Sequence, residues 1–171
     1  KGLATVYDRD ILIFCISQVI AALNEGREVN QTVRFKAFDL LSSTNRGTDG
    51  RGFEQLRAAF ERLSGTRIAT NITTADTEVL DGFGLIDRYR IVRETRDGRM
   101  QEIEVKLSDW VFNAIRNEEV LTLHRDYFRL RKPIERRVYE IARKHCGQQK
   151  SWRITLAKLL LKTGSQSPQK R

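Results

Sequence analysis

Apolar residues recur at helical spacing in the first part of the chain. Through residues 10–24 they return every three or four positions on two adjoining rows, which predicts a largely buried helix. Residues 32–36 alternate between apolar and polar side chains and predict a short strand. Residues 37–44 carry enough apolar side chains for a short helix. The front of the chain therefore begins as helix, strand and helix.

A turn, predicted from its residue types, is followed by a further helix. Residues 45–50 are rich in glycine, asparagine and aspartate and predict that turn. The helix begins near Arg51 and stops at Gly65. Residues 66–74 then alternate and predict a strand. The apolar face of the helix consists of Phe53, Leu56, Phe60 and Leu63.

A β-hairpin is predicted over residues 85–95 and 99–107. A three-residue loop of Arg96, Asp97 and Gly98 gives the hairpin one apolar face, whereas a two-residue loop would oppose apolar with charged residues. The longer loop also puts Gly98 where a left-handed residue is needed. The resulting register pairs Ile91 with Ile103, Tyr89 with Val105 and Arg90 with Glu104.

The back of the chain contains two more predicted helices. Ahead of them, Ser108-Asp109 is a favourable start for a short helix. Residues 120–131 fit either a strand or a helix. Pro133 opens a strong amphipathic helix over residues 133–145. Residues 151–154 predict a short strand, and residues 156–162 predict a short helix.

The order of helix, strand, helix, turn, helix and hairpin predicts the fold. It is the winged variant of the helix-turn-helix, an α+β fold, with an antiparallel wing enlarged to about three strands. We assign this first winged-helix domain to residues 1–120.

An internal sequence similarity predicts a second winged helix that begins near Pro133. Residues 32–35 and the apolar residues after them return at a constant offset of 119 as residues 151–154. True duplication and chance similarity are both open on this short pattern. On the first interpretation, residues 121–171 form a basic linker and the start of a second domain, truncated before a recognition helix expected to start near Ser167 or Pro168.

Charge is distributed unevenly along the chain. The 31 Lys and Arg against 22 Asp and Glu give a net charge of +9. Residues 1–120 hold 17 basic and 19 acidic side chains, whereas residues 121–171 hold 14 and 3, so the net charges are −2 and +11. Such asymmetry indicates contact with nucleic acid or a membrane. The longest apolar run, residues 11–23, is too short to span a bilayer, so we expect no membrane partner.

Candidate base-reading residues lie where the first domain should meet DNA. The second helix of a helix-turn-helix enters the major groove with its N-terminal residues. Here those residues are Arg51 and Gln55, which can bind guanine and adenine edges. Arg46 in the preceding turn and Arg57 on the helix are further DNA-binding candidates. Two glutamates interleave with these cations, so a solvated face or a protein contact is equally open.

The back of the chain supplies the larger set of DNA-binding candidates. A surplus of cations this large favours phosphate contact and a steep dependence of binding on salt. Three of them, on the helix after Pro133, are expected to lie away from its apolar stripe: Arg136, Arg143 and Lys144. The remaining candidates are Arg129, Arg131, Lys132, Arg153, Lys158 and Lys162.

Catalytic and metal-binding patterns are weak. His145 beside Cys146 matches no zinc spacing, and no phosphate-loop signature is present. Cys15 and Cys146 form no disulfide framework, which favours a reducing cytosolic setting. We therefore expect no metal, no cofactor and no catalytic residue. An enzyme that acts on DNA through Tyr127 or Tyr139 is kept as an alternative.

Short stretches throughout the chain resemble the plasmid replication initiator protein A family. The most characteristic begin with Tyr7-Asp8-Arg9-Asp10 at the front and with Arg136-Arg137-Val138-Tyr139 at the back. The matching stretches are residues 7–13, 44–47, 65–68, 70–72, 82–87, 107–110, 121–123, 126–128 and 136–145.

This resemblance implies a bacterial, plasmid-associated cytoplasmic protein that binds repeated double-stranded DNA at an origin. Such a protein starts replication by recruiting host replication proteins. The family is similar in plan to iteron-binding initiators, in which the front winged helix often serves dimerisation and the back one reads most of the DNA. A homodimer through the first domain is therefore expected. A winged-helix transcription repressor is the alternative function.

Overall fold

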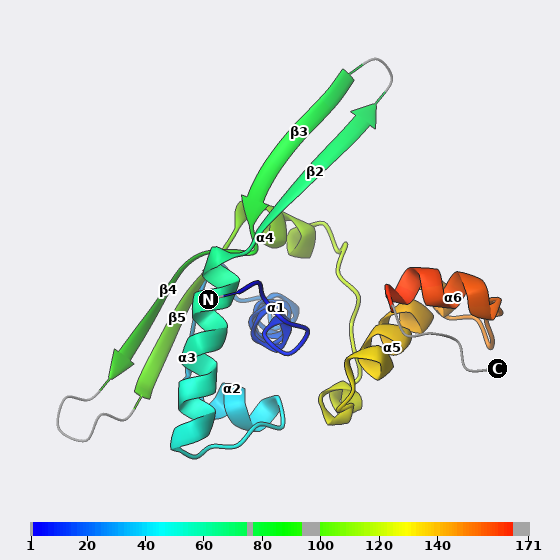
Figure 1. The fold of residues 1–171 in the computed structure, drawn as a ribbon. Coiled ribbons are helices and arrows are strands. Elements are labelled where there is room, and N and C mark those ends of the chain that lie inside the picture. Colours follow the sequence, from blue (N-terminus) through cyan, green and yellow to red (C-terminus); the bar gives the residue numbers. More distant parts are fainter. Residues whose placement is uncertain (1, 75–76, 94–99, 166–171) are drawn as a thin grey trace. The chain divides into compact units, whose positions relative to one another are not determined.

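The structure is a computed structural model that describes residues 2–74, 77–93 and 100–165 (Figure 1). Its internal contacts divide the chain into two compact units, Lys1–Val120 and Leu121–Arg171. In the first unit, the elements are α1 (Arg9–Asn24), β1 (Thr32–Lys36), α2 (Ala37–Ser43), α3 (Gly50–Gly65), β2 (Arg67–Thr74), β3 (Thr77–Gly84), β4 (Ile86–Arg93), β5 (Met100–Leu107) and α4 (Asp109–Arg116).

The helix-turn-helix and its hairpin wing are present as predicted. β5 lies between β1 and β4 in an antiparallel sheet of three strands. The hairpin register agrees with the apolar-face argument, because Ile91 lies opposite Ile103 and Arg90 opposite Glu104. The predicted loop residues 96–98 lie outside the described residues. The winged-helix prediction is therefore confirmed, together with the strand register.

The enlargement of the wing differs from the prediction. The strand expected at residues 66–74 does not join the hairpin sheet but pairs with β3, which the sequence analysis did not predict. The two strands form a separate ribbon that extends from the first unit (Figure 1). β3 ends in Asp81-Gly82-Phe83-Gly84, and Asp and Gly are disfavoured in strands, so its extended shape comes from pairing with β2.

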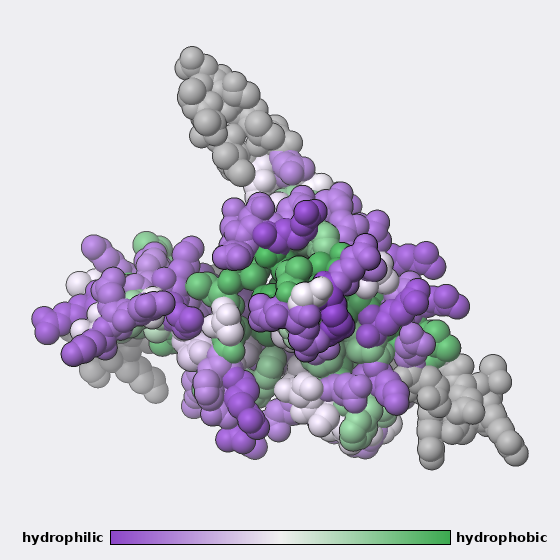
Figure 2. Space-filling view, turned by 180° about the vertical axis from the view of Figure 1, so that it is seen from behind, coloured by the Kyte–Doolittle hydropathy of each residue, from purple (hydrophilic) through white to green (hydrophobic). Residues whose placement is uncertain are grey.

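The core of the first unit lies where the helices pack on the inner face of the sheet. Ile11 and Cys15 of α1 and Phe60 of α3 are fully buried, as are Ile103 and Val105 of β5. These residues belong to the apolar rows that predicted the elements, and they form one continuous cluster. Hydrophilic side chains cover most of the face drawn in Figure 2, with hydrophobic ones visible between them.

The start of α3 depends on a close approach between two glycines. The Asp49 side chain caps the helix by accepting a hydrogen bond from the Gly52 backbone N–H at 2.9 Å. Gly52 is buried, and a Cβ atom at that position would overlap the Gly47 carbonyl oxygen. The turn before α3 can therefore fold onto the helix only while residue 52 has no side chain.

We expect Gly52→Ala to lower the free energy of unfolding by about 2 kcal/mol, as overpacking of a close contact does. The loss occurs although alanine favours a helix over glycine. Gly50→Ala is the matched control, because a Cβ atom there meets no atom within 4 Å. Urea denaturation of both variants measures the difference. Equal stability of the two variants would contradict the close approach.

The second unit contains η1 (Arg125–Arg129), α5 (Pro133–Cys146) and α6 (Leu156–Thr163). Pro133 occupies the first turn of α5, and Gly147 ends the helix at a φ of 57°, as the sequence indicates. The strand predicted at residues 151–154 is wrong, because this segment is irregular. In the first unit, β1 pairs with β5. The described part of the second unit contains no strand that could pair with residues 151–154 in the same way.

Candidate nucleic-acid interface

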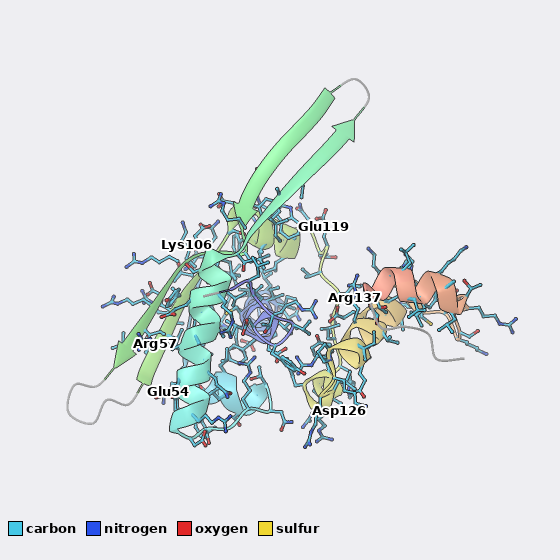
Figure 3. The ribbon with its side chains drawn as sticks, in the orientation of Figure 1. Glu54, Arg57, Lys106, Glu119, Asp126 and Arg137 are labelled. Carbon is cyan, nitrogen blue, oxygen red and sulfur yellow. The ribbon has the colours of Figure 1, made fainter. Side chains whose placement is uncertain are left out.

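α3 presents a mixed polar face to solvent. Its inner face is buried on the sheet, whereas Arg51, Gln55 and Arg57 are exposed, as predicted. Glu54 lies beside them on the same helix (Figure 3). The Arg57 guanidinium lies 3.6 Å from the Glu61 carboxylate, one helical turn away. The face therefore carries, near its N-terminus, residue types that can bind base edges, and an ion pair farther along.

The structure places Arg46 inside a clamp rather than on the open surface. Its Nη2 donates a hydrogen bond to the Tyr7 carbonyl and lies 3.4 Å from the Asp10 carboxylate, which is buried. Asp8, the neighbouring buried carboxylate, accepts two hydrogen bonds from Arg62 of α3, each at 2.7 Å. Both aspartates thus attach the start of α1 to the helix-turn-helix.

The outer face of the sheet carries cations that the sequence analysis did not single out. Arg34 of β1, Arg88 and Arg90 of β4 and Lys106 of β5 are exposed. Two of them have acidic partners, since Arg34 contacts Glu104 at 2.8 Å and Lys106 contacts Asp87 at 3.4 Å. The signal that could have found them is the alternation of the strands, because the register that buries Ile103 points its neighbours outward.

Exposed cations are concentrated in the second unit. Between residues 121 and 165 there are 12 Lys and Arg and 3 Asp and Glu. Two of the ion pairs lie on the surface, Arg129 with Asp126 at 3.3 Å and Lys132 with Glu135 at 3.9 Å. Such exposed pairs contribute little stability, so they compete weakly with a phosphate. The predicted site residues that are exposed here are Arg129, Arg131, Lys132, Lys144, Arg153, Lys158 and Lys162.

Two of the predicted DNA-binding cations are partly or fully buried within the second unit and bind backbone carbonyls there. Arg136 is only 3% exposed, so the expectation that it lies away from the buried stripe is wrong. Its Nε donates to the Leu130 carbonyl at 2.8 Å, and its guanidinium lies 5.0 Å from the centre of the Tyr127 ring. Arg143 is partly buried and donates to the Thr122 carbonyl at 3.2 Å. Helical spacing could not reveal the segment before α5, which covers both side chains.

A cationic hollow lies between α5 and α6. Arg137, labelled in Figure 3, donates from Nε and Nη2 to the Lys162 carbonyl near the end of α6. The hollow has a volume of about 250 Å³, and Lys144 and His145 contribute to its lining. Three cations and Glu140 surround it, which suits an anionic group such as a phosphate.

The groups considered for chemistry are engaged in packing. The Tyr127 hydroxyl is buried and donates to the Glu140 carboxylate at 2.7 Å, and the Tyr139 hydroxyl accepts from the His124 N–H at 3.0 Å. Burial raises the pKa of the Cys15 thiol far above its ordinary value. Among the described residues, His, Cys, Asp and Glu form no group of three able to hold a metal.

None of the helices in the described ranges has the length and apolar character needed to cross a bilayer.

The order of elements and the paired hairpin define the first unit as a winged-helix domain. The whole chain, residues 1–171, matches one family, and the protein belongs to the replication initiator protein A family. A protein of Wigglesworthia glossinidia brevipalpis named "Putative replication protein" is 42% identical over 170 residues. That alignment covers 97% of this chain and 62% of the relative, so the chain spans less than two thirds of the relative's length.

Solved structures of domains 2 and 3 of RctB share the fold. One crystal structure superposes with a TM-score of 0.60 at 12% identity, covering 94% of this chain and 67% of the RctB chain. A second gives a TM-score of 0.56 at 18% identity, covering 95% of this chain and 62% of the other. The likeness at this identity concerns the fold.

Proposed function

We propose that the protein initiates plasmid replication by binding repeated duplex DNA at the origin and recruiting host replication proteins. The observation that carries the proposal is the exposed positive charge of the second unit, combined with membership of a replication initiator family. Cations at this density neutralise phosphates and release counterions, which supplies sequence-independent affinity. The hollow between α5 and α6 offers a place for one phosphate group.

The first unit adds a smaller contact in this proposal. Arg51 and Gln55 occupy the start of α3, where a winged helix meets base edges. The clamp of Asp8 and Arg62 holds α3 against α1 and so fixes the direction of that helix. With a net charge of −2, the unit has no overall electrostatic attraction to DNA, so its DNA contact depends on local cations, and the low charge also suits self-association into a homodimer.

The proposed role is binding without catalysis, in the bacterial cytoplasm. The burial of Tyr127 argues against its attack on a phosphodiester, because a nucleophile must reach the substrate. The position of Tyr139, whose hydroxyl accepts a backbone hydrogen bond, supports the same conclusion.

The proposal is tested by titrating the chain with duplexes that carry the repeats of its own replicon, at several salt concentrations. We expect saturable binding that prefers the repeats over scrambled duplexes and weakens steeply as salt rises. Binding without preference and without a salt slope would overturn the proposal. Preference for a promoter rather than for the origin repeats would favour the repressor alternative.

We expect Arg51→Ala to weaken binding to the repeats by about tenfold or more, the loss of one bidentate base contact. Binding to scrambled duplex should change little, because phosphate contacts remain. Arg116→Ala is the matched control, since it removes an exposed cation from α4 in the same unit. If both variants lower both affinities equally, α3 does not read bases.

A further inference from the structure

A hollow with an aromatic wall lies at the base of the β2–β3 ribbon. Its volume is about 540 Å³, and it is formed where the end of β3, the start of β4 and the first turn of α4 meet. All the elements that line it belong to the first unit. Ser64, at the end of α3, also lines it, whereas the base-reading candidates at the start of that helix do not.

The aromatic wall consists of Trp110 and Phe83. Their rings are stacked, with centroids 4.8 Å apart and planes 20° from parallel. Trp110 remains 52% exposed, although tryptophan is a residue that cores usually cover. A rigid indole that is held by a stacked neighbour and open to solvent can bind an aromatic ring, a base or a cation.

The charge of the hollow decides between these ligands. Among the described residues, the carboxylates of Asp81, Asp87 and Asp109 line it, together with the guanidinium of Arg67. The Asp87 carboxylate also lies 3.4 Å from Lys106 Nζ, so three carboxylates face two cations. The Arg67 guanidinium donates to the Gly82 carbonyl at 3.0 Å and so is held at the wall. A nucleic acid would bring phosphates toward an excess of carboxylates, which repel them. A guanidinium or ammonium group would instead find both the indole face and the carboxylates favourable.

We propose that this hollow is a docking site for a basic peptide segment of a protein partner. One Arg side chain of the partner lies over the Trp110 indole, and neighbouring basic side chains pair with Asp81 and Asp109 and compete with Lys106 for the exposed Asp87 carboxylate. The site thus carries a function separate from DNA binding: it selects a positively charged protein segment on the unit whose net charge is −2. The opposite charge preferences allow one chain to hold DNA and a partner protein together.

The test uses the full chain with Trp152→Phe, which leaves Trp110 as the single tryptophan. A short peptide of alternating arginine and glycine is titrated while the Trp110 emission is recorded. We expect a saturable change at a ratio of one to one, and no change with a peptide of alternating glutamate and glycine. Replacing the three aspartates by asparagine should raise the dissociation constant by about tenfold, the sum of three exposed charge pairs.

The matched control replaces three exposed carboxylates outside the hollow: Glu28→Gln, Asp39→Asn and Glu118→Gln. It removes the same net charge and should change the constant less than about twofold. Equal weakening by both triple variants would overturn the proposal, because it would indicate attraction to charge in general. Saturation of the Trp110 signal by single-stranded DNA, or by raising the protein concentration alone, would overturn it in favour of a base site or a second copy.

Trp110→Phe separates the aromatic contribution from folding. The ring retains its stacking on Phe83, and a phenyl face binds a cation less strongly than an indole. Binding of a labelled arginine peptide should weaken while the thermal transition and the salt slope for origin DNA stay unchanged. Unchanged peptide binding would contradict the role of the indole. Because the salt dependence of origin-DNA binding is measured separately, a failure of peptide docking can be told apart from a failure of the proposed function.

Discussion

Replacing Asp8 by Asn is expected to lower the free energy of unfolding of the first unit by about 3 kcal/mol. The side chain keeps its size but loses the charge that Arg62 requires, and breaking a buried ion pair on one side is costly. The Asp8 residue is 2% exposed, and both of its carboxylate oxygens accept hydrogen bonds from Arg62 at 2.7 Å. Because the Arg62 side chain is 26% exposed, we expect the low end of the usual range.

The same pair makes the stability of the first unit depend on pH. Burial raises the pKa of Asp8, but hydrogen bonds from Arg62 and from Thr5 outweigh it and hold the pKa below its ordinary value of 3.8. A carboxyl with a lowered folded-state pKa stabilises the fold above its unfolded-state pKa. This contribution is complete at neutral pH and is lost as pH falls below 3.8 and through the folded-state value.

Urea denaturation followed by the emission of Trp110 in a Trp152→Phe background reports on the first unit. Glu25→Gln is the matched control, because it breaks the exposed pair with Arg27, whose side chains are both 61% exposed. That change should cost less than about 1 kcal/mol. If Asp8→Asn proves as stable as the control at neutral pH, the clamp does not hold α1 to α3.

The second large effect is expected when exposed lysines of the second unit are neutralised. The triple change Lys144→Gln, Lys158→Gln and Lys162→Gln should lower the affinity for duplex DNA at all sequences. The slope of log affinity against log salt should fall by about 0.9 for each lysine that neutralises a phosphate. Lys144 and Lys162 both line the hollow between α5 and α6, so their loss also removes the proposed phosphate position.

The matched control removes three exposed cations of the first unit: Arg27→Gln, Lys36→Gln and Arg116→Gln. It reduces the net charge equally, so a general field effect would weaken binding equally. We expect the control to keep most of the salt slope. A larger loss in the control would move the main phosphate contact from the second unit to the first.

Local pattern was sufficient for the helices and the hairpin because both depend on the neighbours in sequence. α3 follows its apolar face from the Asp49 cap to Gly65, and the register of β4 and β5 follows from a period of two. Local pattern did not predict the β2–β3 ribbon, because β3 has two glycines near its end, and such a segment becomes a strand only when it pairs with another strand. The absent strand at residues 151–154 is the reverse case, a suitable pattern for which the described part of the second unit supplies no partner strand.

The candidate interface shows the same division. Arg51, Gln55 and Arg57 are exposed where the helical period placed them, and the excess of cations in the second unit is a property of composition. Arg46 and Arg136 look equivalent to other arginines in the sequence, yet their guanidinium groups lie against protein partners. A helical wheel describes one helix and contains no information about what packs on it.

Periodicity and composition were enough to predict the winged-helix order, the hairpin register and the separation of a neutral front from a basic back. These properties depend on periodicity and composition, which are local or additive along the chain. Only the folded chain shows which arginines bind Asp8 and Asp10 and which arginine is buried over the Tyr127 ring. It also shows that Trp110 and Phe83 stack beside an acidic hollow. Such contacts depend on which segments pack against one another, and the spacing of residues within one element does not specify that.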